Sequence, residues 1–402
     1  MFYRMSTMTK PNRNNKNPNC RIQIYNMETT YPPMAFNQLS QFLASGLTSR
    51  DGTAQLSQIR AAAHFLGIQK SPFIIHEIDA QLQNALMVGT DMEWYESGPK
   101  RITEVGISVL PVLQGPLSKP IHALNNMEVH HIRLKNTAHM INGEKCPGHP
   151  EEFEFGSTCF VDLQEAKQAF TEAFIQHDAY GNPRPIILCG HAIDNDLDIL
   201  RKNFEIDLEA WDVIVLVLDT QAMAKELGMN PSHLMSLKSI LEQYCVEEKY
   251  LHNAGNDIAQ TMVAASLLAG EVTTGRGRYS PVNQIDVDNL KAMMRNRNTF
   301  SWGTPLFCTN CDSTEHLVGQ CPKTYICTRC AYRASWKHMA HTHPVGKCVR
   351  PPFPCKDCIE STNKSRQRDA MTHYIEDCHL EKLRKIKSPP HEMVYSMRLL
   401  LV

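Results

Sequence analysis

The sequence lacks any run of roughly 18 apolar residues, the length that a membrane-spanning helix requires. Its opening stretch, MFYRMSTMTKPNRNNKNPN, also lacks the apolar centre of a secretory signal peptide. Net charge is almost absent, with 41 Lys and Arg against 42 Asp and Glu. The lack of an apolar span and of a signal peptide argues against a membrane partner and against secretion. We therefore expect an intracellular protein, either cytoplasmic or nuclear.

The small net charge conceals an uneven distribution along the chain. Residues 301–402 carry 15 Lys and Arg against 9 Asp and Glu, so the first 300 residues are net acidic. An acidic body with a basic tail fits a metal-binding domain joined to a polyanion-binding module, although a random surface imbalance would give the same counts. Nine of the 14 cysteines lie between Cys308 and Cys378. Because disulfides are rare in reducing compartments, this crowding favours metal binding.

A chain of 402 residues is long enough for two or three domains. The segments NALMVGTD, ITEVGISVL and MEVHHIRL follow one another without helices, which predicts antiparallel strands. RPIILCG and VIVLVLD alternate with helical patterns, as parallel strands do. The expected fold is α/β, a mixed sheet flanked by helices. The predicted regions are a disordered N-terminus (1–32), a helical lead-in (33–74), the α/β domain (75–272), a linker with one short helix (273–300), a cysteine-rich region (301–380) and a basic tail (381–402).

Acidic residues stand beside three apolar segments of the α/β domain. Asp91 and Glu93 are two positions apart in a predicted strand, so they project from the same face. Asp196 follows an apolar strand, and Asp257 begins the last predicted helix, with His252 on the loop before it. Carboxylates that cluster in this way suit two Mg²⁺ or Mn²⁺ ions, and an imidazole suits a general base. Taken together, these residues predict a site that hydrolyses phosphodiesters.

In this order, Asp91-x-Glu93, GHAIDNDLDIL with Asp196 and His252-x4-Asp257 resemble the DEDD superfamily of 3′–5′ exonucleases, which are DnaQ-like. The histidine matches the DEDDh branch, and VGTDMEWYESGPKRITEVGI resembles fungal members, many of uncharacterised role. The resemblance covers about residues 75–270. It implies a ribonuclease H-like fold, four carboxylate metal ligands, His252 as general base and release of nucleoside monophosphates from a 3′ end.

The chain departs from the family pattern at several positions. Trp94 stands where many members have a small hydroxyl residue, and it could either stack on a base or simply pack. Ala192 replaces an Asn that often follows the histidine of the second motif. The stretch from about 115 to 156 is longer than compact exonucleases need, and it could shape substrate access. Asp194 and Asp198 flank Asp196 without its spacing.

One further acidic residue, Asp219, ends the apolar strand VIVLVLD. We interpret it as the cap of the following helix and not as part of the site.

The cysteine-rich region repeats one metal-binding pattern three times. Each unit has two cysteines separated by two residues, then a histidine, and a final cysteine four residues beyond it, which is the Cys₃His set of a structural zinc knuckle. His338 and His341 compete with His343 in the second unit. The three predicted zinc sets, holding one to three ions in all, are Cys308, Cys311, His316 and Cys321; Cys327, Cys330, His343 and Cys348; and Cys355, Cys358, His373 and Cys378.

Zinc knuckles of nucleic-acid-binding proteins grip single-stranded bases with aromatic and basic side chains. The candidates are Trp94, Tyr325, Arg329, Arg333 and Trp336. The leading hypothesis is a metal-dependent exonuclease on RNA or single-stranded DNA, RNA being favoured, with the zinc modules as a tether. The alternatives are a non-catalytic nucleic-acid- or protein-binding protein that retains a nuclease-like scaffold, with the zinc modules as a site for a protein partner, and a retroelement-derived RNA-binding protein.

Overall fold

The structure is a computed structural model of the chain. It describes residues 35–48, 57–71, 74, 76–96, 100–113, 117, 119–143, 145–230, 232–274, 282–297, 302–332, 334–349 and 355–369. The predicted disordered N-terminus (1–32) and basic tail (381–402) lie outside the described residues. So do Arg333, His373 and Cys378.

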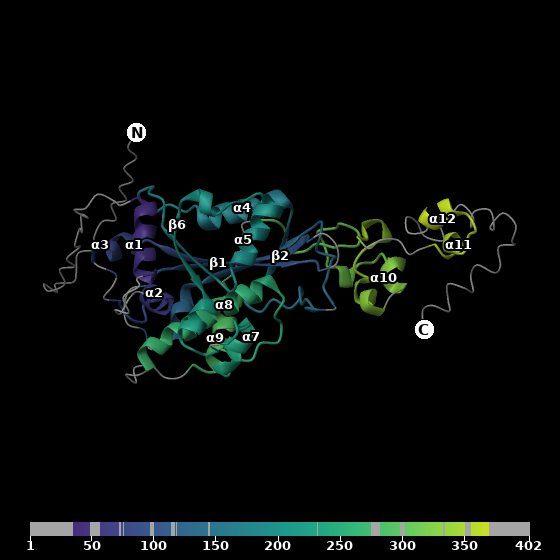
Figure 1. The fold of residues 1–402 in the computed structure, drawn as a ribbon. Coiled ribbons are helices and arrows are strands. Elements are labelled where there is room, and N and C mark those ends of the chain that lie inside the picture. Colours follow the sequence, from purple (N-terminus) through teal and green to yellow (C-terminus); the bar gives the residue numbers. More distant parts are fainter. Residues whose placement is uncertain are drawn as a thin grey trace, which may run out of the picture. The chain divides into compact units, whose positions relative to one another are not determined.

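A six-stranded sheet forms the centre of the α/β domain, in the order β4-β3-β2-β1-β5-β6 (Figure 1). β1 pairs antiparallel with β2, and β2 pairs antiparallel with β3, as the three helix-free segments predicted. β5 runs parallel to both β1 and β6. The strands are β1 (Leu86–Trp94), β2 (Ile102–Pro111), β3 (Glu128–Leu134), β4 (Thr158–Val161), β5 (Ile186–Gly190) and β6 (Ile214–Asp219). The mixed, ribonuclease H-like sheet is therefore confirmed.

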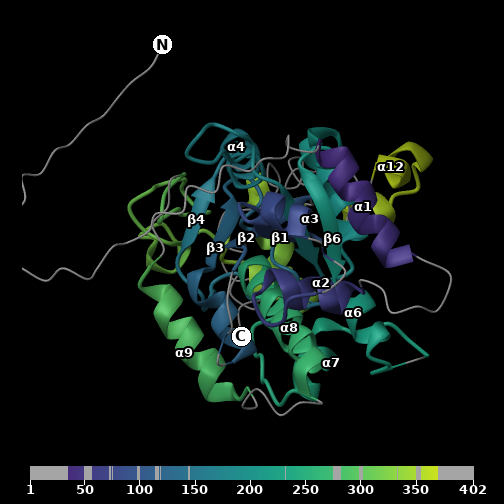
Figure 2. The ribbon, with the colours of Figure 1, turned by 90° about the vertical axis from the view of Figure 1, so that its left-hand side faces the viewer.

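Helices cover both faces of this sheet (Figure 2). Most helices are short, and three-residue to seven-residue turns of 3₁₀ or π type connect several of them. The α-helices are α1 (Phe36–Thr48), α2 (Gln58–Phe65), α3 (His76–Leu82), α4 (Leu163–Phe174), α5 (Asp194–Ile199), α6 (Thr220–Glu226), α7 (Leu237–Gln243), α8 (Ala254–Thr274), α9 (Gln284–Arg295), α10 (Thr328–Tyr332), α11 (Lys356–Ile359) and α12 (Lys364–Asp369). The remaining turns are η1 (Pro120–Asn126), η2 (Leu200–Phe204), η3 (Glu209–Trp211), η4 (Val318–Gln320), η5 (Ala334–Met339) and η6 (Val345–Lys347).

Two apolar cores follow from the alternation of side chains along the strands. In β1, Met87 enters the core that includes α1, α2, α8 and α9, whereas Leu86 and Val88 enter the core that includes α4 and α5. Because strand residues two positions apart share a face, Asp91 and Glu93 lie on the side of Met87, the side of α8. The sheet therefore directs both carboxylates toward the helix that carries Asp257.

α8 lies unusually close to the centre of the sheet. A Cβ on Gly106 of β2 would lie 1.9 Å from the backbone oxygen of Ala254, and a Cβ on Gly89 of β1 would lie 2.6 Å from Ile258 Cδ1. Only glycine permits this approach. α8 is buried along most of its length, and in the part of the chain that the structure describes no helix combines the length and apolar character needed to cross a bilayer.

α9 occupies the segment expected as a linker with a short helix. Asn283 and Asp286 form a capping box at its N-terminus. Val287, Leu290 and Met294 are buried in the core that α8 also enters. Residues 284–295 therefore belong to the packed body of the α/β domain and do more than connect it to the cysteine-rich region.

We predict that Gly106→Ala lowers the free energy of unfolding by at least about 2 kcal/mol, because the new methyl group would overlap backbone that cannot rotate away. Gly89→Ala should cost less, since its nearest atoms are the ends of the Ile258 and Ser108 side chains. Gly319→Ala, which meets nothing within 4 Å, is the control. Chemical denaturation of the three variants checks the order, and equal stability of Gly106→Ala and Gly319→Ala would refute it.

Candidate active site

All five residues predicted to be catalytic line one cavity of about 630 Å³ at the end of β1. Asp91 and Glu93 come from β1, Asp196 from α5, and Asp257 from α8, with His252 just before that helix. These residues are up to 166 positions apart in the sequence, and the fold brings them to one place.

Glu93, His252 and Asp257 form the tightest group in this cavity. Each offers one possible ligand atom, and these atoms lie within 4.8 Å of one another. His252 Nδ1 is 3.5 Å from Glu93 Oε1, and the backbone N–H of His252 donates to Asp257 Oδ2 at 2.8 Å. His252 has a φ of 64°, in the left-handed region that few non-glycine residues adopt. The contacts to Glu93 and Asp257 therefore fix a histidine whose backbone is strained.

Asp196 is held directly against β1. Its Oδ1 accepts a hydrogen bond from the backbone N–H of Met92 at 3.0 Å, and the side chain is only 5% exposed. Met92 lies between Asp91 and Glu93 in the strand, so this bond ties α5 to the acidic end of β1. Asp194, which precedes Asp196 by two residues, is exposed.

The other acidic neighbours have structural positions. Asp198 is exposed and contacts Lys202 and Arg201 on its own helical segment. Asp219 caps α6 as predicted, accepting from the backbone N–H of Gln221 at 2.7 Å. It also accepts from the backbone N–H of Ile193 at 3.1 Å.

Burial dominates the electrostatics of the site. It raises the pKa of Asp91 and of Asp257 well above the ordinary value, and it raises that of Asp196 to about 8. Neighbouring carboxylates reinforce the shift at Asp91, and burial also raises the pKa of Glu93. The pKa of His252 is raised chiefly by its hydrogen bond to Glu93. Asp196 and Asp257 are buried, and Asp91 and Glu93 are half-buried. These four carboxyls, which resist becoming anionic together, form a donor set that fits hard divalent cations, whose charge would stabilise all four as anions.

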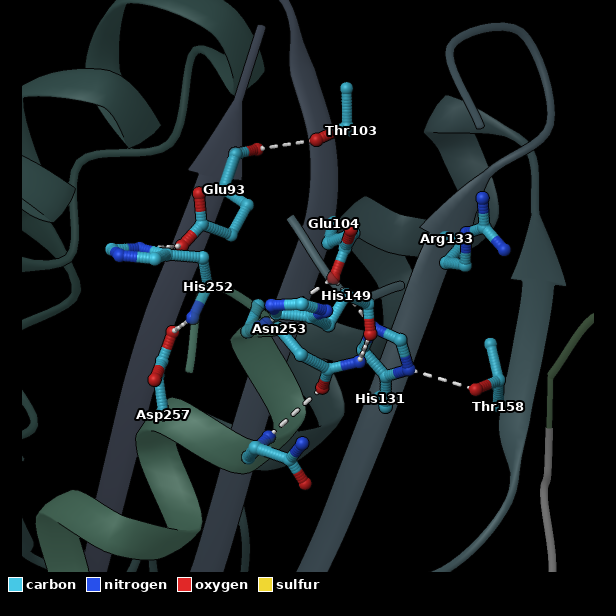
Figure 3. A network of polar contacts seen from close by, with 12 residues as sticks. Glu93, Thr103, Glu104, His131, Arg133, His149, Thr158, His252, Asn253 and Asp257 are labelled. Atoms are coloured by element: carbon cyan, nitrogen blue, oxygen red, sulfur yellow. Dashed lines mark hydrogen bonds and ion pairs between the residues drawn. The ribbon is translucent and has the colours of Figure 1, made fainter. Parts of the chain in front are cut away.

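A second network of hydrogen bonds lies next to the site, centred on Glu104, and the sequence analysis did not predict it (Figure 3). Glu104 of β2 is 5% exposed and lies opposite Glu93 in the strand pairing. Its Oε2 is 2.9 Å from His131 Nε2 and accepts from the backbone N–H of Ala254 at 3.3 Å. His131 Nδ1 is 2.8 Å from Thr158 Oγ1. Glu104 thus binds the first residue of α8, just after His252.

A charged residue in an apolar strand was the available signal for this network. Glu104 interrupts ITEVGISVL, and His131 interrupts MEVHHIRL. Each can be read singly as a solvated strand position, and only the pairing of β2 with β3 places them together.

The cysteine-rich region contains the first two predicted ligand sets. In each set the four possible ligand atoms lie within 4.8 Å of one another, and in the second set the histidine is His343. His338 instead contacts the backbone oxygen of Ile141 through Nε2. In the third unit Cys355 and Cys358 are buried, whereas its other two predicted ligands lie outside the described residues. Both complete sets have the thiolate and imidazole donors that suit tetrahedral zinc.

The candidate nucleic-acid-binding side chains differ in accessibility. Trp94 lines the acidic cavity, and Lys100 lies over its ring at 4.9 Å. Tyr325 is 42% exposed, whereas Trp336 is 8% exposed and packs in an apolar cluster with Met339. The prediction that Trp336 stacks on bases therefore disagrees with its burial, because a packed ring offers no open face. The local sequence could not reveal this packing.

Comparison with known proteins gives three findings. Residues 86–268 match the model of the family DEDDh_C, described as DNA polymerase III subunit epsilon-like, C-terminal domain. An uncharacterized nucleolar protein of Schizosaccharomyces pombe is 29% identical over 194 residues, covering 46% of this chain and 68% of that protein. Among solved structures, E. coli exonuclease I with single-stranded DNA is similar at 14% identity and a TM-score of 0.31, covering 49% of this chain and 42% of that one. Another structure of exonuclease I gives a TM-score of 0.30 at 14% identity, covering 48% and 42%. This chain thus spans less than half the length of those exonuclease chains.

We predict that, without Mg²⁺ or Mn²⁺, the protein loses stability between pH 6 and pH 8. A carboxyl whose pKa is raised on folding holds its proton in the folded state, so stability falls as the pH rises toward the folded pKa, about 8 for Asp196. Thermal unfolding with zinc retained measures this. Asp196→Asn should reduce the pH dependence, and the exposed Asp194→Asn should not. An unchanged slope in Asp196→Asn would contradict the assignment.

Proposed function

From the match of residues 86–268 to the DEDDh_C model, we propose that this protein is a 3′–5′ exonuclease of the DEDDh family that uses divalent cations to hydrolyse RNA or single-stranded DNA. One observation carries the proposal. Four carboxylates and one histidine, in the order of the family's motifs, line a single cavity. The burial of so many acidic groups lowers stability unless they bind something positive, which favours an enzyme over a scaffold that has lost its chemistry.

Bound to the four carboxylates, two Mg²⁺ or Mn²⁺ ions would supply Lewis-acid activation of the phosphodiester and of water. The chain itself handles the proton. His252 Nδ1 faces Glu93, so Nε2 is the nitrogen that accepts a proton from the attacking water. The Glu93 contact favours the protonated ring that results, and the bond from the His252 backbone to Asp257 holds the ring in place. Product release then yields a nucleoside monophosphate and a chain shortened by one residue.

Basic side chains around the cavity suit a polyanionic substrate whose backbone extends beyond the carboxylate cluster. Lys238 and Lys249 line the same cavity and are exposed, so they can contact backbone phosphates outside the carboxylate cluster. Trp94, at the end of β1, lines the same cavity with an aromatic ring.

We propose RNA as the polymer, with a nuclear location. The S. pombe relative is described as nucleolar, which favours a nuclear role for this chain. The exposed ring of Tyr325 and the zinc-binding sets fit single-stranded RNA. A protein partner at the zinc modules is the second candidate, supported by the exposed apolar side chains of Ile326, Val345 and Ile359.

The test uses the full chain with 5′-labelled single-stranded RNA and DNA in Mg²⁺ or Mn²⁺. We expect a ladder that shortens from the 3′ end, no cleavage after chelation of the divalent cations, and no cleavage by Asp91→Asn. His252→Ala should lower kcat by about 10²–10⁴-fold, because it removes the general base. The exposed His177→Ala is the matched control and should retain activity. Tight binding of RNA without cleavage in every metal tested would support the scaffold alternative and refute the enzyme.

A further inference from the structure

Residues 138–143 and 145–149, here called the wall segment, connect two parts of the molecule that the sequence suggested were independent. The segment follows β3 and forms part of the long stretch between β3 and β4. Asn142, Cys146, Pro147 and His149 line the acidic cavity. The segment also contacts Thr342 and Lys347, which directly precede two ligands of the second Cys₃His set and lie about 200 positions further along the chain.

A short relay of hydrogen bonds joins a zinc ligand to the wall segment. His343 Nε2 lies on the side of Cys330 Sγ, at 3.7 Å, as expected for a nitrogen that shares an ion with this thiolate. The other ring nitrogen, Nδ1, is 2.9 Å from Thr342 Oγ1. With Nδ1 donating, the single proton of the Thr342 hydroxyl is shared between the backbone oxygens of Met339 at 2.9 Å and His139 at 3.0 Å. Zinc-bound histidines are commonly oriented by such a partner.

Further contacts join the wall segment to the region of the second zinc set. His139 Nε2 is 3.0 Å from the backbone oxygen of Lys347. The backbone N–H of Ile141 donates to Met339 Sδ at 3.3 Å. Burial contributes as well, because one apolar cluster contains residues of both parts: Tyr95 and Met140 of the α/β domain with Cys327, Cys330, Trp336, Met339 and Ala340 of the zinc module. The second zinc set is therefore packed against the catalytic domain.

On the cavity side, the wall segment binds the end of β1. Asn142 Nδ2 donates to the backbone oxygen of Trp94 at 2.8 Å, and Asn142 Oδ1 accepts from the backbone N–H of Glu96 at 3.0 Å. The Glu96 carboxylate in turn accepts from the backbone N–H of Cys146 at 2.8 Å. These bonds begin one residue after Glu93.

The same segment also binds the loop of the general base. The backbone N–H of His149 donates to the backbone oxygen of His252 at 3.2 Å. Asn253 Nδ2 donates to the backbone oxygen of His149 at 3.0 Å. The wall segment thus binds the chain one residue after Glu93 and binds the backbone of His252 itself.

From these contacts we propose that the second zinc set, through Thr342 and the wall segment, positions Glu93 and His252 for catalysis. Thr342 and Asn142 are the positioning residues. This inference rests on the proposed exonuclease function and changes the expected role of the tail. A tether would act on substrate affinity alone, whereas a support for the wall segment acts on the affinity of the catalytic cations and on turnover.

The decisive variants leave all four zinc ligands in place. Thr342→Val keeps the size of the side chain and removes the hydrogen bonds of the hydroxyl. Asn142→Ala removes the hydrogen bonds to Trp94 and Glu96 on the cavity side and leaves the zinc set unchanged. The exposed Thr324→Val is the matched control. For each full-length variant we would measure zinc content, the Mn²⁺ dissociation constant by calorimetry, and kcat and KM on RNA. Circular dichroism checks that each variant is folded.

We expect Thr342→Val and Asn142→Ala to bind Mn²⁺ about 10-fold or more weakly, the range seen when residues that orient metal ligands are removed. Their kcat should fall while KM for RNA changes little, and Thr324→Val should match the wild type. Unchanged Mn²⁺ affinity in both folded variants overturns the inference, and a rise in KM alone favours the tether. If the variants bind Mn²⁺ more weakly but the wild-type protein cleaves no substrate, the positioning role stands and the proposed exonuclease function is refuted.

Discussion

The close packing of α8 on the centre of the sheet is the constraint on which the site depends. Gly89 and Gly106 leave the space for it, and Glu104 binds the first residue of the helix at Ala254. This packing sets the height of Asp257 above β1, and the bond from Asp257 to the His252 backbone then sets the position of the base. Because strands alternate, Asp91 and Glu93 face the same helix. The position of α8 therefore determines the distance between Asp257 and the two carboxylates of β1.

The site concentrates negative charge where the protein can least solvate it. Burial raises the pKa of all four carboxyls, and the nearby Glu104 adds to the repulsion at Asp91, Glu93 and Asp257. Such an arrangement costs stability in the absence of cations and gains affinity in their presence, which is the usual trade between stability and function. The apolar cores on both faces of the sheet supply the stability that tolerates it.

Much of the fold could be predicted from the sequence because the strands carry their own signals. Apolar alternation and β-branched residues marked β1, β2, β3, β5 and β6, and the absence of helices between the first three predicted their antiparallel order. β4 was missed because it has only four residues. Residues 284–295 read as a linker because their polar face dominates, although Val287 and Leu290 reach the core.

The candidate site could also be predicted only in part. Asp91-x-Glu93 and His252-x4-Asp257 could be recognised because each pair is local, and order along the chain linked them to Asp196. The contact of Glu104 with His131 and that of Thr342 with His139 could not be predicted. They depend on strand pairing and on the packing of segments 203 positions apart, which no local pattern records. For the same reason the sequence suggested a free tether where the structure shows a packed module.

The most direct test of the central claim is the anomalous diffraction of Mn²⁺ in crystals of the full chain. The account predicts Mn²⁺ within the carboxylate cluster of Asp91, Glu93, Asp196 and Asp257, and a zinc signal at Cys327, Cys330, His343 and Cys348. Crystals that hold zinc but show no Mn²⁺ among the four carboxylates at saturating concentration would contradict it.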